Sequence, residues 1–324
     1  YLYVMKMPFR GARLRPILVG TLKYSPLLTR LLPLAAGGTA SARYCYAVWM
    51  RHLLFLTRFN GGKIPARVAE IGPGDSIGVG LAALLSGSEN YFALEAIKYW
   101  DNERNLRIFD ELITLFQKRE RIPGNDEFPL LRPILDDHSF PDSILTKQVL
   151  EASLNPDRLE SIRAELRSSD SMDNKILQIK VPWHGENVII PHTCDFIFSH
   201  VVLQHIDEIE PAFSTMVHWL KPSGYVSHII DYRSLGFTKI WNGHWAFTDW
   251  EWKIMVGGRS FSINKKPHSF YVDLFKKNSI ELLYIGKDTL PSQLGRDQLA
   301  KKYRNISEDD LNTSVGYFVG RKSE

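Results

Sequence analysis

The sequence has little cysteine and no long apolar run. Its 324 residues include two cysteines, Cys45 and Cys194, which are too far apart to suggest a disulfide framework or the paired spacing of a zinc site. No apolar stretch approaches the roughly 20 residues that a membrane-spanning helix needs. Pro16, Pro26 and Pro33 interrupt the N-terminal region in which the apolar part of a signal peptide would lie. We therefore expect a cytoplasmic protein, with Cys194 in its core.

A strong excess of one charge is also missing. The chain has 40 basic and 36 acidic residues, a net charge of +4, without the concentrated basic patch of a nucleic-acid-binding protein. The exception is the first 37 residues, whose charged side chains are all basic: Lys6, Arg10, Arg13, Arg15, Lys23 and Arg30. This region is either helical with its basic residues facing water, or an interfacial segment or substrate lid with peripheral membrane contact.

The remaining composition, 44% hydrophobic and 23% charged, is that of a globular protein. Short apolar strands alternate with helices, as in a parallel nucleotide-binding sheet. Expected strands cover residues 67–71, 91–94, 175–180, 194–199 and 225–230, with helices at 76–85 and 207–220. Two final strands, 280–285 and 315–319, are expected to form an antiparallel edge pair.

Three segments do not follow this alternation. Residues 1–62 are expected to form a helical extension or lid, with the strongest helix at 42–59. Residues 97–173 contain amphipathic helices at 102–119 and 142–168 and are expected to form a helical cap inserted into the main domain, residues 63–324. Residues 234–268 form an aromatic lid with four of the eight tryptophans. Those tryptophans suit either a sugar or aromatic acceptor or ordinary packing.

A glycine-rich loop joins the first expected strand to its helix. It reads Glu70-Ile-Gly-Pro-Gly-Asp-Ser-Ile-Gly78, and such glycines let the chain turn sharply and let a ligand approach the backbone. The dinucleotide fingerprint requires a third glycine at position 77, which is isoleucine here. The acidic Glu70 would repel a pyrophosphate but would stabilise a cationic sulfonium amino acid. The loop therefore favours a sulfonium cofactor over a dinucleotide.

On Glu70, Gly72 and Gly74, the sequence resembles the class I S-adenosylmethionine-dependent methyltransferase family, over roughly residues 65–96 and 175–232. Ser76 stands where the family often has a third small residue, and the loop is similar to that of bacterial members linked to polysaccharide or secondary-metabolite pathways. The resemblance implies an α/β fold with a doubly wound, seven-stranded, mostly parallel sheet, and S-adenosyl-L-methionine as cofactor.

Further cofactor contacts are expected at the ends of later strands. Glu95 ends the second strand, 21 residues after Gly74, where a carboxylate can accept hydrogen bonds from both ribose hydroxyls. The resemblance implies that the loop after the third strand, with Val181 and Trp183, contacts adenine. Ser199, at the end of the fourth strand, completes the expected cofactor set.

The acceptor chemistry is predicted from the residues after the fourth and fifth strands. A histidine commonly follows the fourth strand in small-molecule members of the family, and here His200 and His205 do so. A hydroxyl acceptor must lose a proton, which a histidine can take near neutral pH. We expect His205 as the base, His200 as the second candidate, and Asp231 as a residue that orients a histidine. His228 and Asp231 point to opposite faces of a strand, which weakens them as a direct pair of metal ligands. We name no metal ligand, and metal-dependent catalysis stays open as an alternative.

The sequence thus predicts an O-methyltransferase acting on a small molecule or a saccharide. The signatures of exocyclic-amine and cytosine-carbon methylation are absent, as is a phosphate-binding Gly-x-x-x-x-Gly-Lys loop. A non-catalytic cofactor-binding scaffold and, less favoured, a nicotinamide-dependent oxidoreductase stay open as alternatives. The acceptor and the oligomeric state are not predicted.

Overall fold

A computed structural model of the chain describes residues 38–183, 185–257 and 262–323. The basic residues between positions 6 and 30, and with them the membrane-contact and lid expectations, lie outside this part. Within it, no helix is both long enough and apolar enough to cross a bilayer.

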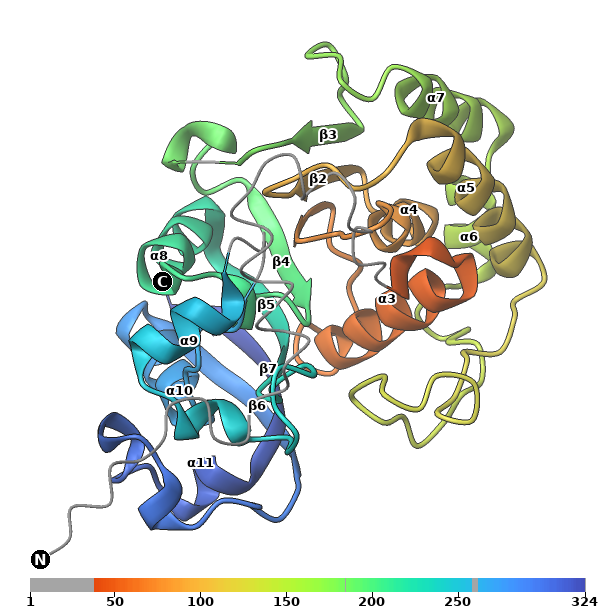
Figure 1. Cartoon of the computed structure of the whole chain (residues 1–324). Helices are drawn as coiled ribbons and strands as arrows, with labels where there is room; N and C mark the ends of the chain where they lie inside the picture. The colour runs from red at the N-terminus through yellow and green to blue at the C-terminus, as the bar shows by residue number, and fades with distance from the viewer. Residues whose placement is uncertain (1–37, 184, 258–261, 324) are drawn as a thin grey trace, which may run out of the picture.

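The described strands form one seven-stranded sheet in the order β3-β2-β1-β4-β5-β7-β6 (Figure 1). β7 pairs antiparallel with both β5 and β6, and the other neighbours pair in parallel. The strands are β1 (Arg67–Ile71), β2 (Asn90–Leu94), β3 (Leu177–Lys180), β4 (Cys194–His200), β5 (Leu220–Asp231), β6 (Ile280–Thr289) and β7 (Thr313–Lys322). The predicted α/β fold class and the antiparallel pairing of the last two strands are confirmed.

Helices cover both faces of the sheet. The longer ones are α3 (Ala42–Thr57), α4 (Gly78–Leu85), α5 (Asn102–Gln117), α6 (Lys147–Ser153), α7 (Pro156–Arg167), α8 (Ile209–Trp219), α9 (Asp249–Val256), α10 (His268–Lys277) and α11 (Glu308–Asn312). Successive side chains of a strand point to opposite faces, so in β4 Phe196 and Phe198 join the core under α3, α4 and α5. Ile197 joins the core under α8 and α10. Cys194 joins that core as well, because the pairing of β4 with β5 is irregular between Cys194 and Phe196, and it is buried as predicted.

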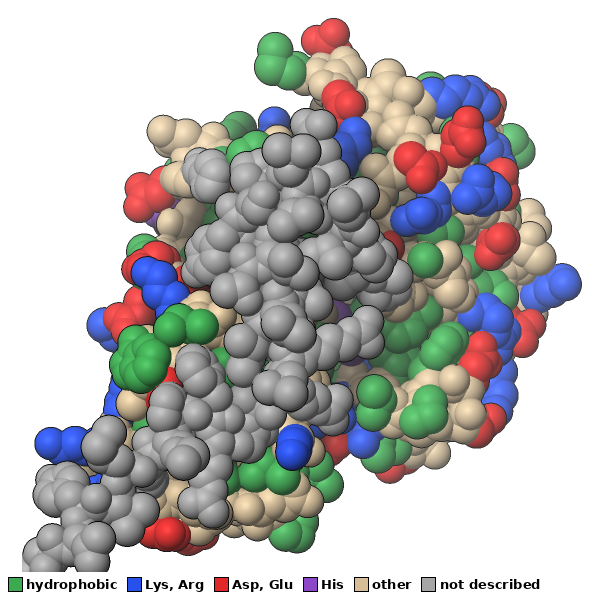
Figure 2. All heavy atoms as spheres, viewed as in Figure 1, with side chains coloured by type: hydrophobic (Ala, Val, Ile, Leu, Met, Phe, Trp, Pro, Cys, Tyr) green, Lys and Arg blue, Asp and Glu red, His purple; other side chains and the backbone are tan. Residues whose placement is uncertain are grey.

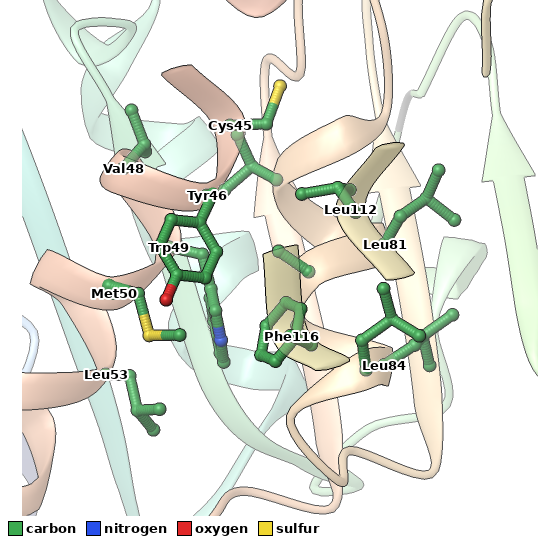
Figure 3. Packing of buried hydrophobic residues seen from close by; sticks show 14 of the residues in the cluster. Cys45, Tyr46, Val48, Trp49, Met50, Leu53, Leu81, Leu84, Leu112 and Phe116 are labelled. Carbon is green, nitrogen blue, oxygen red and sulfur yellow. The ribbon is translucent and has the colours of Figure 1, made fainter. Parts of the chain in front are cut away.

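The helix predicted at 42–59 is part of the main core. α3 packs against α4 and α5, and Figure 3 shows Tyr46, Trp49 and Leu53 of α3 facing Leu84 and Phe116. The Trp49 indole N–H donates to Ser86 Oγ at 2.7 Å, so the buried polar atom of this large side chain is satisfied.

The segment predicted as one helix over 142–168 is two helices. Asn155 caps the second one by accepting from the N–H groups of Asp157 and Arg158, and Pro156 takes its first position. Proline cannot donate inside a helix and is well tolerated at a helix start, which explains the break. The predicted 221–224 turn likewise lies inside β5, next to an irregularity in the pairing of β4 with β5.

The aromatic segment 234–268 packs mainly through its tryptophans. The indole N–H groups of Trp241, Trp245 and Trp252 donate to the backbone carbonyls of Pro291, Lys265 and Ile263. None of these tryptophans lies on the wall of the cavity described below, which favours the packing interpretation over an acceptor platform.

Candidate active site

A cavity of about 1060 Å³ opens at the carboxyl ends of β1, β2, β4 and β5. This edge, where the strand order reverses between β1 and β4, is where open α/β sheets bind ligands. Eight of the predicted site residues line the cavity: Glu70, Gly72, Gly74, Glu95, Trp183, His200, His205 and Asp231. The structure therefore brings most of the predicted site together from the ends of five strands, β1 to β5.

The loop glycines are required by backbone conformation and by space. Gly72 and Gly74 have φ angles of +71° and +79°, a region that other residues rarely adopt. A Cβ atom on Gly72 would also lie 2.6 Å from both γ carbons of Val202. The loop thus presents bare backbone to the cavity, as close approach of a ligand requires.

Glu95 is tied to the glycine loop. Its Oε2 accepts from the Gly74 N–H at 3.2 Å and its Oε1 from the Ala96 N–H at 2.8 Å. Its backbone carbonyl accepts from the Trp183 N–H at 3.2 Å, which joins the ends of β1, β2 and β3. Partial burial raises the pKa of the Glu95 carboxyl, against the effect of its backbone hydrogen bonds. The carboxylate is oriented before any ligand binds.

Glu70 is a buried acid at the floor of the cavity. The Tyr91 hydroxyl donates to its Oε2 at 2.5 Å, and the Tyr91 ring fits against Gly80, where a Cβ atom would lie 1.9 Å from the ring. Burial raises the pKa of Glu70 to about 8, and the Tyr91 hydrogen bond acts in the opposite direction. Glu70 is therefore mostly protonated at neutral pH in the protein alone.

Three residues predicted to contact the cofactor lie off the cavity wall. Ser76 Oγ donates to the Thr39 carbonyl and accepts from the Gly78 N–H, so it ties the chain before α3 to the loop. Ser199 Oγ lies 2.8 Å from Nδ1 of the buried His228. Val181 packs against the core. Their predicted cofactor contacts stay predictions.

The two candidate bases lie in different surroundings. His200 is half-buried beside Tyr44 and His52, and its Nδ1 has no hydrogen-bond partner among the described residues. Burial lowers the pKa of His200 to about 3, and the positive charge of Arg51 adds to this effect. A neutral imidazole with so low a pKa accepts protons poorly at neutral pH.

His205 has partners that orient its ring. Its Nδ1 lies 2.6 Å from the Ser262 carbonyl, which accepts only from a protonated Nδ1, so the basic lone pair is on Nε2. The Gln204 side-chain nitrogen lies 3.2 Å from that Nε2. Burial lowers the pKa of His205, whereas the Ser262 carbonyl and the charge of Asp231 raise it. Of the two histidines, His205 is the better placed to take a proton.

Asp231 is held by an arginine that sequence reasoning missed. Arg233 Nε and Nη2 donate to the two carboxylate oxygens at 2.9 and 2.6 Å, and the Arg233 backbone N–H donates to Oδ1 at 2.8 Å. The predicted role of Asp231 in orienting a histidine stays a prediction, since no described residue gives it a hydrogen bond from a histidine. Among the described residues, no three metal-binding side chains gather into a site.

Other residues on the wall also went unrecognised in the sequence. Tyr44 and Val48 come from α3, and residues 127–131 come from the loop between α5 and α6. The spacing of Tyr44 and Val48 places them on one face of the helix. The sequence could not show that this face lines the cavity, because its position depends on contacts with distant residues. Figure 2 shows hydrophobic side chains at the surface on the side where this loop lies in Figure 1.

No family model and no curated protein matches this chain. Solved structures that it is similar to include a methyltransferase from Methanosarcina mazei (10% identity, TM-score 0.41, covering 81% of this chain and 94% of that one). Another is a methyltransferase from Mesorhizobium loti (9%, 0.39, 85% and 98%). A third is phosphoethanolamine N-methyltransferase 2 from Haemonchus contortus with S-adenosyl-L-methionine (15%, 0.41, 88% and 58%). Likeness at this level gives no information on substrate.

Proposed function

We propose that this chain is an S-adenosylmethionine-dependent methyltransferase that methylates an oxygen of a small molecule. The observation that carries the proposal is the pairing of Glu95 with the Gly72–Gly74 loop, through the 3.2 Å hydrogen bond from the Gly74 N–H, at the mouth of a cavity of about 1060 Å³. A carboxylate at the end of β2 accepts from ribose hydroxyls, and the loop lets the cofactor lie close to the backbone.

The charges of the described site fit a cationic cofactor. Glu70, Asp75 and Glu95 all line the part of the cavity above β1 and β2, and one oxygen of the buried Asp75 carboxylate has no hydrogen-bond partner among the described residues. The charged side chains that a pyrophosphate would meet on this part of the described wall are all acidic, which argues against a nicotinamide dinucleotide. When bound, the cofactor supplies an electrophilic methyl group on a positively charged sulfur.

The chain's own residues align the acceptor, exclude water and remove its proton. Glu95 and the backbone of the Gly72–Gly74 loop would hold the cofactor, which would supply the methyl group to the acceptor oxygen and keep the electron pair of the carbon–sulfur bond. The acceptor proton goes to His205 Nε2. Gln204 Oε1 is buried with no hydrogen-bond partner in the described part of the chain, and rotation of the Gln204 amide would let this oxygen accept from the protonated ring.

Titration of the purified chain with S-adenosylhomocysteine, measured by calorimetry, tests the cofactor assignment. We expect S-adenosylhomocysteine to bind with a micromolar Kd, which corresponds to a binding free energy of about −8 kcal/mol. We expect no binding of NAD in the parallel titration. Binding of NAD alone would replace the proposal with the oxidoreductase alternative. Cofactor binding without turnover on a broad acceptor panel would instead favour the scaffold alternative.

Substitution of His205 tests the base. His205→Asn is expected to lower kcat by about 10²–10⁴-fold, the usual contribution of a general base, while S-adenosylhomocysteine binds as before. The comparison variant is His200→Asn, because the His200 imidazole of the parent chain is neutral but poorly basic. A larger loss of kcat in His200→Asn than in His205→Asn would reassign the base to His200.

A further inference from the structure

We infer that the methyl acceptor is a neutral molecule with an apolar or aromatic body, bound between α3 and the loop at residues 127–131. This inference rests on the proposed function, since it concerns the half of the cavity that lies away from the cofactor loop and Glu95. We call this half the acceptor side; it is lined by Tyr44, Val48, residues 127–131, His200, His205 and the Asp231–Arg233 pair.

The cavity is large enough for two molecules. Sites for a single drug-sized ligand span about 300–1,000 Å³, whereas this cavity measures about 1060 Å³. The loop glycines and Glu95 lie over β1 and β2, while His200 and Asp231 end β4 and β5 on the other side of the strand-order reversal. A cofactor on the first pair of strands therefore leaves the second pair to the acceptor.

The wall of the acceptor side is mostly apolar. Phe128, Pro129, Leu130 and Leu131 follow one another on it. The Tyr44 ring meets Phe128 edge to face at 5.3 Å and His200 at 6.4 Å, so one continuous aromatic surface leads to the end of β4. Such a surface suits an apolar or aromatic body. It offers few of the polar partners that the hydroxyls of a saccharide would need on losing water.

α3 clamps the apolar loop in place. The buried Arg51 donates from Nε and Nη2 to the carbonyls of Pro133 and Pro123, both at 3.0 Å, and the Tyr46 hydroxyl donates to the Glu120 carbonyl at 2.6 Å. Inside the loop, Asn125 donates to the carbonyls of Phe128, Pro129 and Leu131. The wall is therefore formed before an acceptor arrives, which reduces the cost of ordering it on binding.

The charged groups of the acceptor side are paired within the protein. Glu127 is bound through both oxygens by Arg43 at 2.7 Å, and Asp231 by Arg233. Arg233 is the one lysine or arginine on the described wall, and its charge is already balanced by Asp231. An anionic acceptor would find no other lysine or arginine on the described wall and would face the acidic side chains of the cofactor half. A neutral acceptor avoids both costs.

Two matched phenols and a sugar test this inference on protein saturated with S-adenosylhomocysteine. Calorimetry should show methyl 4-hydroxybenzoate binding about ten-fold more tightly than 4-hydroxybenzoate, which differs by one negative charge, and methyl glucoside more weakly than either. Tighter binding of the anion or of the glucoside would overturn the inference, as would failure of all three to bind up to their solubility limits. Failure of S-adenosylhomocysteine itself to bind would instead overturn the proposed function.

Two exposed residues of the same loop locate the binding. Leu130 lines the cavity and is 69% exposed, whereas Ile134 is 58% exposed and lies off the wall, so both tolerate a polar side chain. Leu130→Glu should weaken binding of methyl 4-hydroxybenzoate by about ten-fold through the lost apolar contact, and Ile134→Glu should leave it unchanged. Both variants should bind S-adenosylhomocysteine like the parent chain. Equal effects of the two substitutions would contradict this placement of the acceptor.

Discussion

Replacement of Glu95 by alanine is expected to lower the affinity for S-adenosylhomocysteine by about 10²–10⁴-fold, while the chain stays folded. Two ribose hydroxyls donating to one carboxylate contribute about 1.5–3 kcal/mol each. The structure orients this carboxylate beforehand through the N–H groups of Gly74 and Ala96, so little of that energy is spent on ordering it. Calorimetric titration of both proteins measures the change.

Glu89 provides the matched control for this substitution. It is an exposed acid directly before β2, at the opposite end of the strand from Glu95. Glu89→Ala removes an acidic side chain at the other end of β2, away from the cavity wall. The affinity of this variant for S-adenosylhomocysteine should equal that of the parent chain. Unchanged affinity in Glu95→Ala would remove the observation on which the methyltransferase proposal depends. A parallel loss in both variants would point to general destabilisation instead.

Acidification below pH 6.5 is expected to destabilise the fold steeply, because several histidines are buried in neutral form. Burial lowers the pKa of His200, His228 and His244 to about 3, and that of His52 lies well below 6.5 for the same reason. The unfolded chain binds protons on these rings near pH 6.5, whereas the folded chain does not, so their contribution is fully present above pH 6.5 and is lost as the pH falls toward 3. Each histidine contributes up to about 1.4 kcal/mol per pH unit.

Glu70 has the opposite effect on the pH dependence of the unfolding free energy over part of this pH range. The pKa of its carboxyl is about 8 in the fold, against 4.5 as the ordinary value, so its contribution is present below pH 4.5 and is lost as the pH rises through 8. Between pH 4.5 and 6.5 it offsets about one histidine. The histidines outnumber it, and the free energy of unfolding should still fall with acid.

Urea unfolding at a series of pH values tests this expectation with His228→Leu. His228 is buried between Phe213 and Phe275, and its loss should reduce the slope of unfolding free energy against pH by up to about 1.4 kcal/mol per unit between pH 3 and 6.5. An identical slope in His228→Leu and in the parent chain would show that His228 does not titrate as the structure indicates.

The elements that position the site were accessible from local sequence. β1 matches its predicted bounds, and β2 and β4 differ from theirs by one residue, because short apolar runs closed by glycine or polar residues define buried parallel strands. The sequence Asn155–Pro156 is typical of a helix cap followed by proline. The apolar spacing continues on both sides of it, so the sequence predicted one helix where the structure has two. Local pattern predicted where strands end, and therefore where the polar side chains meet.

The acceptor side was not accessible in this way. Its apolar loop reaches the cavity because Arg51 binds the carbonyls of residues that lie 72 and 82 positions further along the chain. Neither an arginine inside an apolar helix nor a proline-containing loop indicates such a contact by itself. The hydrogen bond from the Ser76 hydroxyl to the Thr39 carbonyl, 37 positions earlier, could not be predicted for a similar reason.

Binding of a cation in this cavity is coupled to the loss of a proton from Glu70. A cation placed near this carboxyl favours its ionised form, so ligand binding and release of the Glu70 proton are two parts of one equilibrium. Affinity for a positively charged ligand should then rise with pH up to about 8, and the measured heat should vary with the ionisation enthalpy of the buffer. S-adenosylhomocysteine, which lacks the sulfonium charge, would release fewer protons than S-adenosylmethionine. The difference between the two titrations would count the protons that leave the buried carboxyl.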